Sequence, residues 1–311
     1  MEKITMSKTT NLTVEEAFQL FIRKCKIKNL TELSIESYEK KILRFYEFYG
    51  RDTLLSEIRS STIDDYILWL RQNTNGNDIT INSYLRTVRA FLYYCMDSKY
   101  VQTFKIKLIK AEKKIKETYT EDELMVLLKK PDIDNCSFSV FKTWVFENYL
   151  LGTGNRISTA LNVKIEDINF DDGFITLRKT KNRKQQIIPL SATLNEILKE
   201  YLEIRGGKPE DYLFCNEYGE KASERTYQQL VRRYNVKHNV NKTSCHAFRH
   251  SFAKNWIIAG GDIFRLQKIL GHSDLTVTKE YVAMFSTDLQ LDFERFNPMD
   301  NLKTSRHTIR M

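Results

Sequence analysis

The sequence predicts a mainly α-helical protein with a small antiparallel β-sheet, arranged as two domains. Apolar residues recur at the i, i+3, i+4 spacing of amphipathic helices along most of the chain. Two short extended runs, Phe174–Leu177 and Gln186–Ile188, flank a polar, basic turn and indicate a β-hairpin. The chain has 311 residues, of which 41% are hydrophobic, so it is long enough for two domains and can form a core in each.

The first predicted domain covers residues 1–104 and consists of four helices. No proline occurs before Pro131, so the strongest helix breaker is absent from this region. Thr13 and Glu16 form a capping box at the start of the first helix, and Gly50 ends the second helix. Four amphipathic helices in about 90 residues are typical of a small all-α domain whose core holds their aromatic stripes.

A lysine-rich segment at residues 105–116 is predicted to link the two domains. It contains six lysines and one glutamate, a composition that usually belongs to a solvated connection. Because it lies between two regions with helical patterns, we place the domain boundary there. Its lysines, Lys113 and Lys114 among them, are also candidates for contacts with phosphate groups.

The second predicted domain covers residues 117–295 and is followed by a tail at residues 296–311. A second capping box, formed by Thr120 and Glu123, opens this domain. Helical patterns continue on both sides of the β-hairpin, and glycines separate the last helices. The hairpin therefore places a small antiparallel β-sheet within a mainly helical domain.

The positive charge of the chain is concentrated in two segments. Lys and Arg number 49 and Asp and Glu 40, which gives a net charge of +9 and favours a polyanionic partner. Residues 225–254 contain seven basic and no acidic residues, and the hairpin turn at residues 178–184 contains five basic residues in seven. The candidate phosphate contacts in these two segments are Lys179, Arg183, Lys184, Arg232 and Arg233.

Several other classes of protein are disfavoured. No stretch approaches the ~18 consecutive apolar residues that span a bilayer, and the first residues contain no apolar signal segment. The sequence contains no basic amphipathic helix of the kind that binds an acidic membrane surface. The five cysteines are widely separated and odd in number, which indicates the reduced thiols of a cytosolic protein.

The densest group of chemistry-bearing residues is His246-Ala-Phe-Arg249-His250. On a helix, the two histidines and the arginine share one face. Zinc is one alternative, but the glutamate of the HExxH motif is absent and Arg249 would place a cation beside the metal. A phosphate explains the arginine better, because a guanidinium bonds two phosphate oxygens while an imidazole moves a proton. We therefore expect neither a metal nor a cofactor.

Two further motifs complete a pattern that spans residues 119–285. Thr-Gly-Asn-Arg156 precedes the hairpin, and Leu-Gly-His272 is followed nine residues later by Tyr281. In this order, together with the basic hairpin and the His-x-x-Arg-His group, these motifs resemble the tyrosine recombinase, or phage integrase, family. The helical first domain and basic linker resemble the core-binding domain of that family, and the second domain resembles its catalytic domain.

The resemblance implies a role for each motif residue. Tyr281 is expected to be the nucleophile, which becomes joined to a DNA 3′-phosphate and leaves a free 5′-hydroxyl. Arg156 and Arg249 are expected to neutralise the charge that develops on the phosphate oxygens. His246 is expected to help the tyrosine lose its proton, and His272 to hydrogen-bond the phosphate or to steady the site. This chemistry requires no metal and no ATP.

At two positions the roles of the family's residues do not carry over directly to this chain. The hairpin lysine that protonates the departing 5′-oxygen falls on Lys181, counting back from Pro189, with Lys179 as the alternative. The family usually carries Glu or Asp three residues after its first arginine, where this chain has Thr159. That acid supports the arginine, so its replacement removes no reacting group but puts the positioning of Arg156 in question.

The implied activity is site-specific DNA recombination, as the integrase of a mobile element or as a Xer-like resolvase. The implied partner is a double-stranded DNA recombination site. A homotetramer assembles on two such sites from monomers, with an excisionase or a DNA-bending protein as accessory factor. The implied location is the bacterial cytoplasm, at the nucleoid, without membrane association.

Two alternatives have the same fold or the same chemistry. A non-catalytic DNA-binding regulator would not need the complete set of nucleophile and phosphate-binding residues. A type IB topoisomerase shares the chemistry but relaxes DNA as a monomer. The Leu-Gly-His motif and the short helical first domain favour the recombinase over the topoisomerase.

Overall fold

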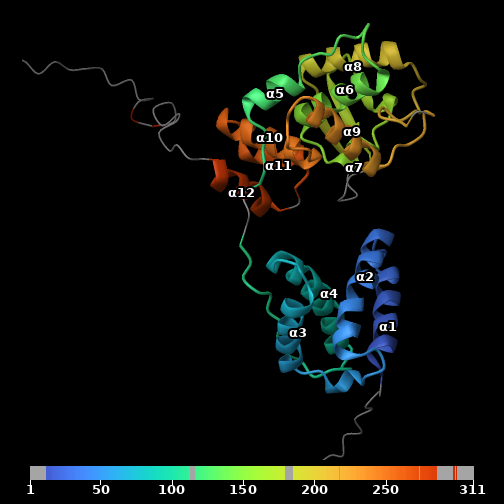
Figure 1. The fold of residues 1–311 in the computed structure, drawn as a ribbon, viewed down its shortest axis with the longest axis vertical. Helices are drawn as coiled ribbons and strands as arrows, with labels where there is room; N and C mark the ends of the chain where they lie inside the picture. The colour runs from blue at the N-terminus through green and yellow to red at the C-terminus, as the bar shows by residue number, and fades with distance from the viewer. Residues whose placement is uncertain are drawn as a thin grey trace, which may run out of the picture. The chain divides into compact units, whose positions relative to one another are not determined.

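The computed structural model describes most of the chain as two compact units, which divide between Lys114 and Ile115. The described residues are 12–112, 116–178, 185–216, 218–272 and 274–285, together with residues 297 and 299. Each unit is described below by itself, and both appear in Figure 1. No helix in these ranges is both long and apolar enough to cross a membrane.

The N-terminal unit contains four helices (Figure 1). Their bounds are α1 Val14–Ile27, α2 Glu32–Tyr49, α3 Ser60–Asn73 and α4 Asp78–Asp97, with a short 3-10 helix, η1, at Leu55–Glu57. The capping box of Thr13 and Glu16 is present as predicted, and Gly50 ends α2 with a φ of 92°. Only glycine adopts such a φ at little cost, which explains the stop.

Aromatic side chains form the core of the N-terminal unit. Phe18 of α1 meets Phe91 of α4 edge-on, with ring centroids 5.5 Å apart. The segment predicted as a linker begins with residues that pack on the same helix. The Asn82 side chain donates to the carbonyl of Ile109 and accepts from its N–H, at 2.9 and 3.0 Å. Lys113 and Lys114 lie outside the described residues.

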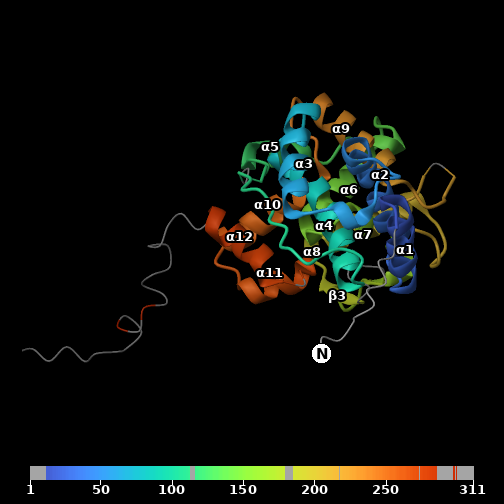
Figure 2. The same cartoon turned by 90° about the horizontal axis from the view of Figure 1, so that it is seen from below.

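The C-terminal unit surrounds one apolar helix, α6 (Phe138–Thr153). Helices α8, α9 and α10 pack against it, and both Figure 1 and Figure 2 show α10, α11 and α12 as a neighbouring group. The remaining helices are α5 Glu121–Leu127, α7 Ile157–Ala160, α8 Ala192–Arg205, α9 Glu224–Lys237, α10 Cys245–Ile258, α11 Ile263–Leu270 and α12 Leu275–Phe285, with the 3-10 helix η2 at Ile165–Asp167.

The β-sheet has three antiparallel strands in the order β1-β2-β3. These are β1 Ile168–Asn169, β2 Phe174–Leu177 and β3 Gln186–Pro189. The predicted hairpin of β2 and β3 is confirmed, and so is the small antiparallel sheet, in which β1 also pairs with β2. A strand of two residues is too short to show alternation, so periodicity could not reveal it.

The turn of the hairpin, residues 179–184, lies outside the described residues. The predicted positions Lys179, Lys181, Arg183 and Lys184 therefore have no structural description.

Candidate active site

Arg249 holds three segments of the C-terminal unit together. Its guanidinium donates from Nη1 to the carbonyl of Gly154 and from Nη2 to the carbonyl of Leu270, both at 2.8 Å. Gly154 caps the end of α6 and Leu270 is the last residue of α11, so both acceptors are helix C-termini, which favour a cation. These two bonds fix the side chain of Arg249, and the residue is only 4% exposed.

The glycine of the Thr-Gly-Asn-Arg motif is required by this packing. Gly154 has a φ of 62°, and a Cβ there would lie 2.6 Å from the ring of Phe252. The tight turn ends α6 and leads directly to Arg156, which precedes the short helix α7. The motif therefore brings a half-buried arginine beside Arg249, close enough for the two charges to interact.

Two buried or half-buried cations give the site a strong positive field. Burial and the charge of Arg156 lower the pKa of Arg249 to about 10, which leaves the guanidinium charged at neutral pH. Burial also lowers the pKa of Arg156. In the described part of the chain, no carboxylate contributes to the pKa shift of either arginine. An anion bound here would relieve the repulsion between the two charges.

His272 connects Arg249 to α12. Its Nε2 lies 2.8 Å from Nη2 of Arg249, and its Nδ1 lies 2.9 Å from Oγ1 of Thr278. Because a guanidinium can only donate, Nε2 accepts and the proton of the ring is on Nδ1. Burial and nearby cations lower the pKa of His272 to about 4, so the ring is neutral at pH 7.

Tyr281 of α12 lies against His272. The two rings are nearly parallel, at 4°, with centroids 6.2 Å apart, and the tyrosine is 2% exposed. Its hydroxyl lies 2.7 Å from Nδ1 of His250, and Nζ of Lys116 lies 4.1 Å from the centroid of its ring. Burial raises the pKa of Tyr281, while the charges of Arg249 and Arg156 oppose that rise.

The structure thus brings four predicted site residues together: Arg156, Arg249, His272 and Tyr281. His246 lies one turn before His250 on α10, with ring centroids 6.5 Å apart, and is exposed. Within the described ranges, no three His, Cys, Asp or Glu side chains are arranged as a metal site requires.

Sequence reasoning did not assign two residues that contact Tyr281. His250 was part of the His-x-x-Arg-His motif and shares a helix face with His246, which was the available signal. Lys116 was only the last lysine of a basic segment. In the structure it also forms an ion pair of 3.2 Å with Glu280 of α12. Nothing in the local sequence indicates that this lysine reaches the tyrosine.

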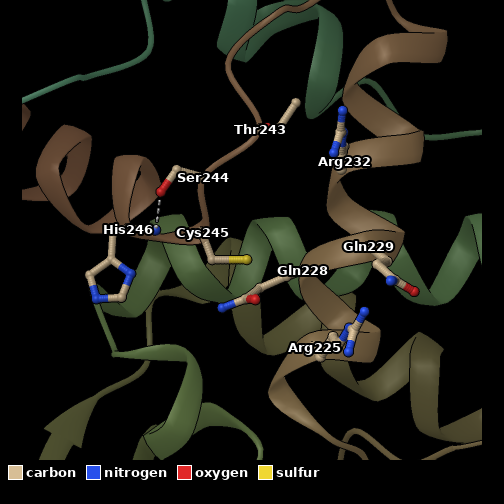
Figure 3. Close-up of a pocket in the computed structure, with 8 residues that line it drawn as sticks. All are labelled: Arg225, Gln228, Gln229, Arg232, Thr243, Ser244, Cys245 and His246. Atoms are coloured by element: carbon tan, nitrogen blue, oxygen red, sulfur yellow. Dashed lines mark hydrogen bonds between the residues drawn. The ribbon is translucent and has the colours of Figure 1, made fainter. Parts of the chain in front are cut away.

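A second feature, a basic hollow of about 290 Å³, lies between α9 and the start of α10. In Figure 3, Gln228 points from α9 toward the Ser244–His246 segment. Arg232 is exposed at this hollow and Arg233 is exposed beside it in sequence. The lining residues are Arg225, Gln228, Gln229, Arg232, Thr243, Ser244, Cys245 and His246.

The model of the phage integrase family matches residues 117–287. The chain belongs to the phage integrase family. It is therefore a tyrosine recombinase, an enzyme that cleaves and rejoins DNA. This confirms the family, the fold class and the enzymatic activity predicted from the sequence.

Two relatives of this recombinase match nearly along their whole length. It is 29% identical to the tyrosine recombinase XerD of Staphylococcus epidermidis over 287 residues, which cover 87% of this chain and 94% of the relative. It is 30% identical to the tyrosine recombinase XerA of Pyrococcus furiosus over 277 residues, covering 88% and 93%. The Tn1549 transposon integrase shares the fold, with a TM-score of 0.74, 20% identity, and coverage of 87% of this chain and 94% of that chain.

Proposed function

We propose that Tyr281 is the nucleophile with which this recombinase cleaves DNA. The observation that carries this proposal is the placement of its hydroxyl beside a pair of buried and half-buried arginines, Arg249 and Arg156. Two cations in one desolvated site favour an anion, and a phosphodiester between them would lie next to the tyrosine.

The proposed reaction exchanges one phosphate ester for another. Tyr281 Oη attacks the phosphorus, the bond to the 5′-oxygen breaks, and a 3′-phosphotyrosyl ester and a 5′-hydroxyl result. Arg156 and Arg249 stabilise the charge on the non-bridging oxygens, and His272 steadies the site through its hydrogen bond with Arg249. Lys181, outside the described residues, protonates the leaving oxygen. Because the new ester retains the energy of the old one, rejoining to a second 5′-hydroxyl needs no ATP.

The experiment that tests this proposal maps the covalent bond. A DNA site is selected by binding from a pool of random-sequence duplexes, and a nicked copy of that site is incubated with the protein. A nick beside the cleavage point lets a short fragment diffuse away, so the adduct cannot reverse. Nuclease treatment followed by mass analysis of peptides should place the remaining nucleotide on Tyr281. A nucleotide on another residue would contradict the proposal.

We further propose that the DNA sites belong to a mobile element, which the recombinase integrates or excises as a homotetramer on two sites. The chain is a monomer in solution, and an excisionase or a DNA-bending protein acts as accessory factor. The Tn1549 transposon integrase was solved in complex with transposon right end DNA. A second candidate role, that of a Xer-like resolvase, is favoured by the relatives named XerD and XerA. Sequencing the DNA junctions formed in the host distinguishes an excised circle from resolution of two chromosomal sites.

We expect the exposed face of α9 to hold DNA through phosphates. Arg232→Ala should weaken binding to the selected duplex by roughly 10-fold and reduce the slope of log affinity against log salt by about 1. The control is Lys208→Ala, an exposed basic residue in the loop after α8, which should change neither quantity. Titrations at several salt concentrations measure both, and equal effects of the two variants would exclude α9 as a specific contact.

The hairpin lysine can be identified by the leaving group that it serves. Lys181→Ala should slow cleavage by roughly 100-fold, because a 5′-oxygen leaves poorly without a proton. A duplex in which sulfur replaces that bridging oxygen has a better leaving group and should restore the rate. Lys179→Ala provides the matched control and should be affected little. If Lys179→Ala shows the defect and the restoration, the catalytic lysine is Lys179.

A further inference from the structure

His250 contacts the atom that reacts. Its Nδ1 lies 2.7 Å from Oη of Tyr281, a normal length for a strong hydrogen bond. The ring is held by α10, and α12, which carries Tyr281, packs directly against that helix. His250 follows Arg249 directly in the motif, and its ring contacts the hydroxyl of Tyr281.

We propose that His250 is the general base that accepts the proton of Tyr281 during DNA cleavage, the role that the family resemblance gives to His246. The inference rests on the proposed function of Tyr281. As the bond from Oη to phosphorus forms, the O–H bond of the tyrosine breaks and its proton moves to Nδ1 of His250. The bond to the 5′-oxygen breaks, and that oxygen takes its proton from the hairpin lysine, so protons and charges balance.

The surroundings of His250 keep its ring unprotonated in the free protein. The described charged and titratable groups that face it are His246 and Arg249 on α10, Lys116 before α5, His272 after α11, and Tyr281 on α12. Glu280 on α12 pairs with Lys116. Burial and the neighbouring cations lower the pKa of His250 to about 4, so the ring is neutral at pH 7.

A bound phosphate changes this balance in the required direction. Its negative charge opposes the fields of Lys116 and Arg249, so His250 becomes more basic when DNA is present. The same arginines stabilise the tyrosinate that develops during attack. Proton transfer is therefore disfavoured in the free protein and favoured in the complex. The ring of His246, with its centroid 6.5 Å from that of His250, is exposed.

His250→Asn tests this role because an amide can keep the hydrogen bond at the position of Nδ1 but cannot take up a proton. Adduct formation is measured in a single turnover on the nicked duplex selected from the random pool. We expect His250→Asn and His250→Ala to be slower than wild type by about 100-fold, with unchanged DNA affinity. His250→Gln is a second variant in case the smaller side chains impair folding. We expect His246→Ala to slow the reaction less than His250→Asn.

A more acidic nucleophile separates a base from a merely positioning residue. With difluorotyrosine at position 281, whose hydroxyl ionises more easily, the defect of His250→Asn should shrink to about 10-fold or less. The duplex with a bridging sulfur should not reduce this defect, because the leaving group is not what His250 serves.

Each failure has its own signature. A covalent adduct in Tyr281→Phe overturns the proposed nucleophile itself. If Tyr281→Phe is inactive but His250→Asn reacts within about three-fold of wild type, the proposed base is wrong while the nucleophile stands. The same conclusion follows if difluorotyrosine leaves the His250→Asn defect unchanged. A defect that does not depend on the acidity of the tyrosine hydroxyl would show that His250 only positions the tyrosine.

Discussion

Tyr281→Phe should bind its DNA site with wild-type affinity and form no covalent adduct. The substitution removes only the hydroxyl, so the ring keeps its packing against His272 and beneath Lys116. The lost hydrogen bond to His250 changes the free energy of unfolding by about 1 kcal/mol. The effect on cleavage is complete, because no other atom at this position can attack the phosphorus.

The measurement is a denaturing gel of the nicked duplex after incubation with protein. Wild type should produce a slow band that protease treatment removes, and Tyr281→Phe should produce none. Tyr234→Phe provides a matched control, because that buried tyrosine also loses one hydrogen bond, to the carbonyl of Leu127. It should keep the slow band. If the adduct persists in Tyr281→Phe, the nucleophile lies elsewhere.

The helices were predictable because their signals are local. The capping box of Thr120 and Glu123 and the stop at Gly50 are each formed by residues a few positions apart, and apolar periodicity connects them. Strand β1 has only two residues and exists because β2 pairs with it. Its stability comes from a partner strand, and no pattern within two residues can indicate that.

The candidate site shows the same division between local and long-range information. Spacing along the chain identified Arg249, His272 and Tyr281. Spacing could not show that Arg249 bonds carbonyls 95 and 21 residues away in sequence. His250 and Lys116 are far from Tyr281 in sequence, so their contacts with the tyrosine also depend on how α12 packs. Motifs therefore predicted which side chains matter, and packing decides which of them touch.

Arg249→Ala should slow cleavage strongly and also destabilise the fold, whereas Arg156→Ala should only slow cleavage. Both remove a charge from the proposed phosphate site, and we expect each to slow adduct formation by roughly 1,000-fold. Arg249 also bonds the carbonyls of Gly154 and Leu270. At 1–3 kcal/mol for each buried acceptor left without a donor, its removal should lower the free energy of unfolding by about 3 kcal/mol.

The two effects can be separated by combining thermal unfolding with single-turnover cleavage. A loss of about 3 kcal/mol corresponds to a fall of roughly 6–12 °C in Tm for a domain of this size, and we expect it for Arg249→Ala alone. Arg249→Lys keeps a cation and three donors but not the planar fork, so it should recover part of the Tm and little of the activity. Equal unfolding temperatures for Arg249→Ala and Arg156→Ala would show that the carbonyl contacts do not hold α6, α10 and α11 together. In that case the buried arginine serves the phosphate alone, and its desolvation is offset only when DNA binds.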